Sequence, residues 1–469
     1  MAEFPPELKK EFEQGLDFFK AGDFARAAAR FDLVAEVAPR YPAALANLAL
    51  SHFKRDNFVA AEAAYRRALE IFPDDSEIGF GLAATVQEAG RLEEACALYK
   101  SLLKARPQHV PALHNLANAL RDLGRFDEAI ASYRAALALK PDHHMCRLGY
   151  SAALFYRGDW EEAWRMFEAR LDVAKVIPSL SFQASGAPQR SGGPQHWTGG
   201  PQPRSLLVIA EQGRGDTIQF ARFLPALARN GRVSLLAGVE MFALLRTLDA
   251  PIDLVPKAGG TVQGITGWVP LLSIPLALGL RPEALAPKIP YLAAEPARVA
   301  RWRERLGGPG FKVGIVWQGN PEGSVDRGRS LPLAAFAPLA AIAGVRLVSL
   351  QKGSGAEQVA GVPFAGRIET LGDDFDAGPD AFLDSAAAMM SLDLVISTDT
   401  AIAHLAGALG RPLWVLLKQA PNWRWLYRGE KNPFYPAARL FRQEVSGDWA
   451  AVMARVAGEL AKLAKQARL

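Results

Sequence analysis

Short polar residues separate an apolar run from an alanine-rich segment late in the chain. The apolar run at residues 392–396 is followed by Ser397-Thr398-Asp399-Thr400, and the alanine-rich segment continues to residue 410. This order is typical of a strand, a tight turn and a helix, with Asp399 or Thr400 at the helix N-cap. Because free N–H groups and the helix dipole attract anions there, the turn predicts a phosphate site.

A second polar turn follows the apolar run at residues 206–210. Gly213 and Gly215 permit a sharp turn that places Asp216 at the start of a helix predicted from Thr217 onwards. The Asp216 carboxylate is a candidate general base, and capping the helix is the alternative role. The G-x-G-x-x-G spacing of dinucleotide-binding turns is absent, which argues against NAD. The loop residues singled out beside Asp216 are Gly213, Arg214, Gly215 and Thr217.

Polar and basic residues follow two more predicted strands in the same half as Asp399. Gln318 and Gly319 come after the first of them, Lys352 follows the second, and Arg329 lies in a polar loop. Positive side chains close to a helix N-terminus suit a diphosphate. Taken singly, Arg329 is equally consistent with a surface charge, and His404 with a hydrogen-bonded core histidine. The candidate diphosphate-site residues are Trp317, Gln318, Gly319, Arg329, Gln351, Lys352, Asp399, Thr400, Ala401 and His404.

The elements that must position these residues alternate between strand and helix from residue 205 onwards. Alternation of this kind predicts parallel sheets covered by helices on both faces, with the binding site beyond the carboxyl ends of the strands. The pattern breaks near residues 287–290 and then begins again. We therefore expect two Rossmann-like halves, residues 205–300 and residues 301–469, facing one cleft. The second half includes a closing amphipathic helix at residues 449–467.

The first third of the chain repeats every 34 residues. A turn residue, an aromatic or leucine, an alanine, an aromatic and a proline recur in order, which resembles the tetratricopeptide repeat. Small residues allow two helices to cross closely, an aromatic fills the remaining space, and proline ends the second helix. We expect an α solenoid of about five helix pairs within residues 1–173. The recurring alanines are Ala27, Ala61, Ala95, Ala129 and Ala163, and the recurring aromatics are Phe31, Tyr65, Tyr99, Tyr133 and Phe167.

A solenoid of this kind has a groove that usually holds an extended peptide. The first helix of each pair is expected to line it, and here these helices carry Asn47, Asn115, Asn118 and Arg121. Asn115 and Asn118 lie about one helical turn apart and could bind a peptide backbone through their amides. Ordinary solvated polarity of a helix is the alternative explanation for each residue. A bound protein is the expected partner, because repeats alone carry no chemistry.

Composition limits the remaining possibilities. A chain of 469 residues with 50% hydrophobic residues has several packed domains, and a net charge of +5 without charge runs does not favour nucleic acid. The cysteines have no metal-ligand spacing, so we expect no metal and a reducing, cytoplasmic location. Neither a signal peptide nor a membrane span is expected. Residues 174–204, rich in proline and glycine, are the predicted linker, with Trp197 docking on the domain that follows.

Several motifs together resemble a bacterial family that joins tetratricopeptide repeats to a heptosyltransferase-type glycosyltransferase domain of GT-B architecture. The resemblance covers nearly the whole chain. The architecture is also similar to that of the eukaryotic nuclear and cytoplasmic O-GlcNAc transferase. The motifs are Glu211-Gln212-Gly213-Arg214-Gly215-Asp216-Thr217, Val316-Trp317-Gln318-Gly319, Ser349-Leu350-Gln351-Lys352-Gly353, Ser397-Thr398-Asp399-Thr400-Ala401-Ile402-Ala403-His404, Gly158-Asp159-Trp160, Pro421-Asn422-Trp423-Arg424-Trp425 and Leu440-Phe441-Arg442-Gln443.

The resemblance implies an inverting transferase that uses a nucleotide sugar as co-substrate, without a metal cofactor. It assigns the base to Asp216, the sugar and diphosphate of the donor to Asp399-Thr400, and the basic donor residue to Arg329. Arg214 departs from the leucine usual in the family, and true heptosyltransferases lack the repeats, so the acceptor is expected to differ. A protein acceptor is the first choice, with flagellin the example that the family suggests. A lipopolysaccharide or other glycan acceptor is one alternative. A non-catalytic repeat scaffold with a degenerate transferase domain is the other.

Overall fold

The computed structural model of the chain describes residues 5–173, 194–259, 262–286, 288–321, 326 and 328–466. The chain divides into two units, Met1–Arg157 and Gly158–Leu469. Most of the predicted linker at 174–204, and residue 287 in the predicted break between the halves, therefore lie outside the described residues. Within the described part of the chain, no helix is both long enough and apolar enough to cross a membrane.

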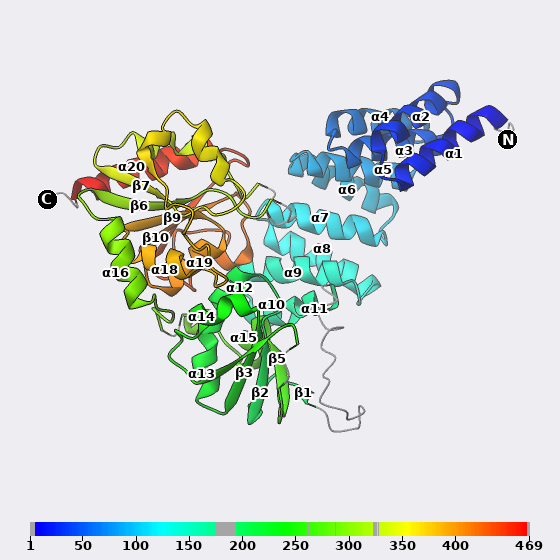
Figure 1. Cartoon of the computed structure of the whole chain (residues 1–469). Helices are drawn as coiled ribbons and strands as arrows, with labels where there is room; N and C mark the ends of the chain where they lie inside the picture. Colours follow the sequence, from blue (N-terminus) through cyan, green and yellow to red (C-terminus); the bar gives the residue numbers. More distant parts are fainter. Residues whose placement is uncertain are drawn as a thin grey trace. The chain divides into compact units, whose positions relative to one another are not determined.

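Helices alone build the first unit, each packing against the next in chain order (Figure 1). The crossing alanines and the recurring aromatics are buried, as the 34-residue pattern predicts. The turn positions Gly22, Asp56, Gly90 and Gly124 all have positive φ, which explains the preference for glycine there. The helices are α1 Pro6–Lys20, α2 Phe24–Val37, α3 Pro42–Lys54, α4 Phe58–Ile71, α5 Ser76–Glu88, α6 Leu92–Ala105, α7 Val110–Asp122, α8 Phe126–Leu139 and α9 His144–Arg157.

The second unit begins with two short helices, α10 Trp160–Phe167 and α11 Arg170–Val173. The sequence pattern assigns α10 to the fifth repeat, as the partner of α9. In the structure α10 is packed inside the second unit, where the aromatic rings of Trp160 and Trp164 contact those of later segments.

A five-stranded sheet forms the first half of the second unit, and all its strand pairs are parallel. Its order is β1-β5-β2-β3-β4. Trp197 follows β1, is buried, and donates its backbone N–H to the Trp268 carbonyl at 2.8 Å, in agreement with the expected docking. The strands are β1 Gln195–His196, β2 Ser205–Ile209, β3 Arg232–Ala237, β4 Ile252–Pro256 and β5 Gly267–Pro270, and the helices are α12 Arg214–Phe220, α13 Leu224–Ala228, α14 Phe242–Leu245 and α15 Ile274–Ala277.

A second parallel sheet of six strands follows, in the order β11-β10-β9-β6-β7-β8. Its central strands β9 and β10 are buried along their whole length, as expected of a sheet covered on both faces. The strands are β6 Phe311–Val316, β7 Val345–Ser349, β8 Ile368–Glu369, β9 Leu394–Thr398, β10 Leu413–Leu417 and β11 Ala438–Arg442. The helices are α16 Pro296–Arg305, α17 Ala337–Ala340, α18 Leu383–Met389, α19 Ala401–Ala408 and α20 Trp449–Gln466.

Candidate functional site

Two helix N-termini, one from each half, lie against each other in the second unit. Helix α12 follows β2 and helix α19 follows β9, and the two pack side by side near the centre of the unit (Figure 1). The contact is close at Gly215, where an added Cβ would lie 3.1 Å from Cδ2 of His404 and 3.3 Å from Cα of Ala401. Glycine at this position therefore allows the predicted phosphate turn and the predicted base loop to meet.

A cleft of about 720 Å³ opens beside this contact. It lies at the carboxyl ends of β2, β6, β7 and β9, the edge at which parallel sheets bind ligands. Its walls come from both halves, because Glu240 of the first half and Asp380 of the second both line it. The sequence-predicted residues that line it are Gly213, Arg214, Gly215, Gln318, Gly319, Gln351, Lys352, Thr400 and Ala401.

Other predicted residues stand behind the cleft wall and form a charged cluster. Asp216 accepts a hydrogen bond from the Gly213 N–H at 3.2 Å, which is the helix-capping contact, and it also pairs with Arg424. The Asp216 side chain is 22% exposed and the Arg424 side chain 8%, so solvent reaches the carboxylate more easily than the guanidinium. Both proposed roles of Asp216, cap and base, are therefore open to it geometrically.

Arg329 packs against Gly319 and is hydrogen-bonded to Asp326. It donates to Oδ1 of Asp326 at 3.0 and 3.1 Å, and an added Cβ on Gly319 would lie 2.2 Å from Nη2 of Arg329. Glycine at 319 therefore leaves the space that the guanidinium occupies. The predicted basic residue is held in place by Asp326 and is mostly buried rather than being a free surface charge.

Asp399 lies close to His404 and Arg424. Burial raises the pKa of the Asp399 carboxyl, and the Trp425 side chain and the positive charges of Arg329 and Arg424 oppose the rise. Nε2 of His404 is 3.9 Å from Oδ1 of Asp399. Asp399 directly precedes Thr400 and Ala401, which line the cleft, and its ionised carboxylate only accepts hydrogen bonds.

His404 is buried and does not reach the cleft. Its Nδ1 lies 3.1 Å from the Tyr435 hydroxyl, and its ring stacks on Trp425 at 5.2 Å. Burial lowers its pKa well below the usual value, and the charges of Arg424 and Arg222 lower it further. His404 is therefore a neutral, hydrogen-bonded histidine, which is one of the two roles that its sequence position allowed.

Gln351 and Lys352 have different tasks at the end of β7. Gln351 accepts from the N–H groups of Trp317 and Gln318 at 3.2 and 3.1 Å, and so joins the ends of β6 and β7. Trp317 itself is buried in the core, and its indole donates to the Gly355 carbonyl at 3.2 Å. Lys352 donates to the carbonyls of Phe375 and Asp376, in the loop that closes one side of the cleft.

Arg424 and Glu240 are among the contributors to the site that were not predicted as site residues. Arg424 belongs to the motif at residues 421–425. Its partner Asp216 is 208 positions away, so no local sequence pattern indicates the pair. Glu240 follows β3 and lines the cleft; its carbonyl accepts from the Ala381 N–H at 2.7 Å and joins the two halves there. Its position after a parallel strand was the available signal.

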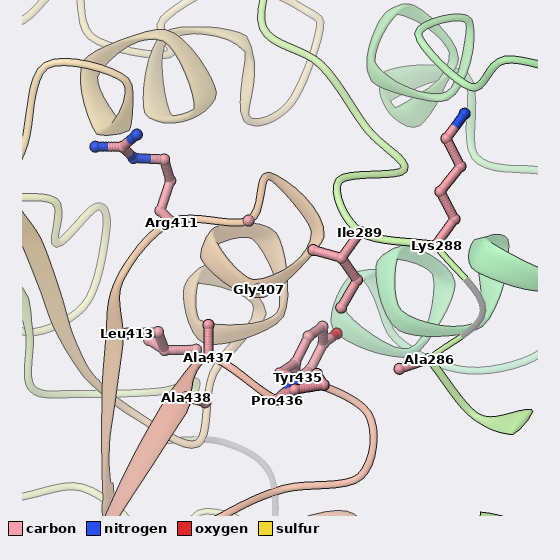
Figure 2. Close-up of a pocket in the computed structure, with 11 residues that line it drawn as sticks. Ala286, Lys288, Ile289, Gly407, Arg411, Leu413, Tyr435, Pro436, Ala437 and Ala438 are labelled. Atoms are coloured by element: carbon pink, nitrogen blue, oxygen red, sulfur yellow. The ribbon is translucent and has the colours of Figure 1, made fainter. Parts of the chain in front are cut away.

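A second cavity, of about 400 Å³, lies at the far end of α19 (Figure 2). Its lining is mostly apolar, and it contains no residue of the predicted site. In Figure 2 the side chains of Lys288 and Arg411 extend away from each other at its rim. Tyr435 lines this cavity and contacts His404, so it connects the cavity with the charged cluster. The larger cleft, which the predicted residues line, is therefore the candidate functional site.

The predicted peptide-binding residues of the first unit are partly engaged by their own solenoid. The Asn115 amide donates to the Tyr99 hydroxyl at 3.2 Å, and Oδ1 of Asn118 accepts from the Tyr133 hydroxyl at 2.6 Å. Asn47 donates to the Ala43 carbonyl of its own helix, and Arg121 pairs with Asp122. These contacts give each side chain a structural role, and peptide binding by them stays a prediction.

Comparisons with known proteins identify the repeats. Tetratricopeptide repeat models match residues 12–76, 52–120 and 110–143, which confirms that part of the expected resemblance. Protein FlbA of Caulobacter vibrioides is 31% identical over 325 residues, which are 64% of this chain and 52% of that protein. The chain thus spans about half the length of this curated relative.

Solved structures also resemble part of the chain. MamA is 17% identical, with a TM-score of 0.33, over 36% of this chain and 92% of that one. A tetratricopeptide repeat protein from Parabacteroides merdae is 23% identical, with a TM-score of 0.33, over 36% of this chain and 67% of that one.

Proposed function

We propose that Gly158–Leu469 is an inverting glycosyltransferase of GT-B architecture, which takes a sugar from a nucleotide-activated donor and passes it to a protein held by the repeats. The observation that carries the proposal is the cleft between two parallel sheets, at the carboxyl ends of their strands, with a charged cluster behind its wall. The motifs that resemble heptosyltransferases supply several of its lining residues. A tetratricopeptide solenoid supports a protein partner.

The donor diphosphate is assigned to the start of α19. Thr400 and Ala401 line the cleft there, and the helix N-terminus attracts negative charge. Lys352 also lines the cleft, and Arg329 packs against Gly319, another lining residue. As the bond to the sugar breaks, charge develops on the diphosphate, and these positive groups stabilise it. Within the described residues, no cluster of His, Cys, Asp or Glu suits a metal ion, and the positive charges would replace one.

Asp216 is assigned as the base. The acceptor hydroxyl oxygen attacks the anomeric carbon while its proton moves to the Asp216 carboxylate. The bond between the anomeric carbon and the diphosphate oxygen breaks, and its electron pair stays on the diphosphate. Attack from the face opposite the leaving group inverts the anomeric centre. Arg424 holds the carboxylate in place through the ion pair.

Nucleotide binding is the first test of this proposal. Calorimetry of the full chain with ADP, GDP, UDP and CDP should detect one that binds with a Kd below about 1 mM. Arg329→Ala and Asp399→Ala should each weaken that nucleotide, or its sugar conjugate, by about tenfold or more. Arg232→Ala is the matched control, because its ion pair with Asp253 lies on the surface at the start of β3. Absence of binding by all four would favour the non-catalytic scaffold.

The acceptor is the second test. Flagellin, incubated with the protein and the nucleotide sugar that binds, should gain the mass of one or more sugars. Transfer to a lipopolysaccharide fraction with no transfer to any protein would replace the protein acceptor by a glycan.

A further inference from the structure

We infer that the α10–α11 segment, Trp160–Val173, positions the Asp216–Arg424 pair, although the sequence pattern gives it to the repeats. The inference rests on the proposed function only for its catalytic consequence. Its structural part stands on the contacts that the segment makes with two loops. One of these loops precedes Asp216, and the other contains Arg424.

The first contact is an aromatic cluster. Trp164 is buried, and its ring lies 5.4 Å from that of Trp423 in an edge-to-face arrangement. Phe167 lies 5.5 Å from the same ring, and Trp160 lies 6.5 Å from it. Edge-to-face pairs at such distances are favourable beyond the burial of their area. Three rings of α10 therefore hold the indole of Trp423.

Trp423 is the residue before Arg424, and the two side chains are in contact. The Arg424 guanidinium lies 4.7 Å from the centre of the Trp423 ring and donates to Oδ1 of Asn422 at 2.9 Å. The guanidinium also pairs with Asp216 and lies 5.8 Å from the centre of the Phe220 ring. A shift of Trp423 would therefore move the guanidinium that orients the proposed base.

The second contact is a buried ion pair. Arg170 of α11 donates to Oε1 of Glu211 at 2.9 Å, and both side chains are almost fully buried. Glu211 also accepts from the N–H groups of Leu271 and Leu272. Burial raises the pKa of Glu211, and Arg170 opposes the rise. Removing the guanidinium would leave a buried carboxylate without this partner, which is strongly unfavourable.

Glu211 lies in the short loop that leads from β2 into α12, the helix that carries Asp216 in its first turn. The segment thus holds the base loop through Arg170 and the Arg424 loop through Trp423. One contact therefore lies beside Arg424, and the other holds the loop that leads to Asp216. Trp164 and Arg170 are therefore positioning residues, acting through Trp423 and Glu211.

Hydrogen exchange tests the positioning without any substrate. In the full chain, Trp164→Ala and Arg170→Gln should each speed exchange of the amides in 211–217 and 421–426 by at least fivefold. Amides of β9 should change less than twofold. Trp164→Phe should restore most of the protection, because a ring still meets Trp423. Trp414→Leu is the matched control, since it removes an indole that packs on Phe441 in the other core.

The two outcomes can be told apart. Equal acceleration over the whole second unit, or the same pattern in Trp414→Leu, would overturn the positioning and leave only general destabilisation. If the exchange pattern holds, release of nucleotide from the donor should fall about tenfold in Trp164→Ala, with little change in donor KM. If exchange changes as expected but the wild-type chain releases no nucleotide, the proposed function fails while the positioning stands.

Discussion

Asp216 has two candidate roles, helix cap and general base. Its hydrogen bond to the Gly213 N–H is a helix cap, and its pairing with Arg424 suits a held base. Asp216→Asn keeps a capping oxygen but cannot take the proton, so turnover should fall roughly 100-fold or more while donor affinity stays the same. Steady-state kinetics beside calorimetry measures both. Near-normal turnover in this variant would return Asp216 to the cap role.

Replacing the Asp399 carboxyl should make the chain more stable and weaken donor binding. Because burial raises its pKa, the folded state holds the proton more tightly than the unfolded chain does. Its stabilising effect is thus present below the unfolded pKa of about 3.9 and is lost as pH rises through the folded value. Asp399→Asn should therefore unfold at a higher temperature than wild type at pH 7, with a difference that shrinks toward pH 4.

Thermal unfolding at several pH values measures the difference for Asp399→Asn, and donor binding should weaken in the same variant. Asp393→Asn is a suitable comparison, since the Asp393 carboxylate accepts a hydrogen bond from the Lys312 N–H at the amino end of β6. A variant of Asp399 that is less stable than wild type at neutral pH would contradict the argument.

At the scale of elements, the contact between α12 and α19 depends on one missing Cβ. Gly215→Ala would bring a methyl group to 3.1 Å from His404 and 3.3 Å from Ala401, so the helix N-termini must separate by a few tenths of an ångström. We expect nucleotide affinity to fall about tenfold, because donor groups must be well positioned to be effective. Gly458→Ala, with open space around its Cβ in helix α20, should instead stabilise the chain by about 1 kcal/mol.

Which elements the sequence predicts follows from how each one buries its side chains. Buried parallel strands are short apolar runs, so the runs at residues 206–210 and 392–396 predict β2 and β9 to within a few residues. Strand β5 was not, because Gly267 begins it and Pro270 ends it, inside a longer apolar stretch. Strand β11 mixes charged and apolar residues at the sheet edge without strict alternation, so its pattern does not predict a strand.

Only part of the site could be predicted from the sequence. Residues at strand ends, such as Lys352 and Thr400, were found because parallel strands bring their carboxyl ends to one edge. Pairs formed by tertiary packing, such as Arg424 with Asp216 and Arg170 with Glu211, leave no local spacing to detect. The repeat period assigns α10 to the solenoid, whereas the helix belongs to the second unit. The period indicates where helices lie in the sequence and does not indicate the unit in which each helix packs.

For the whole molecule, the last prediction separates acceptor binding from chemistry. A chain of residues 158–469 keeps α10 and α11, whereas a chain of residues 205–469 begins where the sequence placed the transferase halves. The longer one should bind and slowly hydrolyse the donor like the full chain, since all residues assigned to the diphosphate lie within it. It should lose most modification of a protein acceptor, because the solenoid no longer raises the local acceptor concentration.

The chain of residues 205–469 lacks Trp164 and Arg170, and also β1 and the buried Trp197, so it should differ from the longer one in donor hydrolysis as well. We expect a further loss of about tenfold in nucleotide release, measured at equal folded fraction by circular dichroism. Residues 1–157 alone should capture the acceptor and no nucleotide sugar. If residues 158–469 modify the acceptor as fast as the full chain, the repeats do not select the substrate, and a glycan acceptor becomes the better account. If both truncated chains hydrolyse the donor equally, α10 and α11 contribute to folding and not to the position of the base.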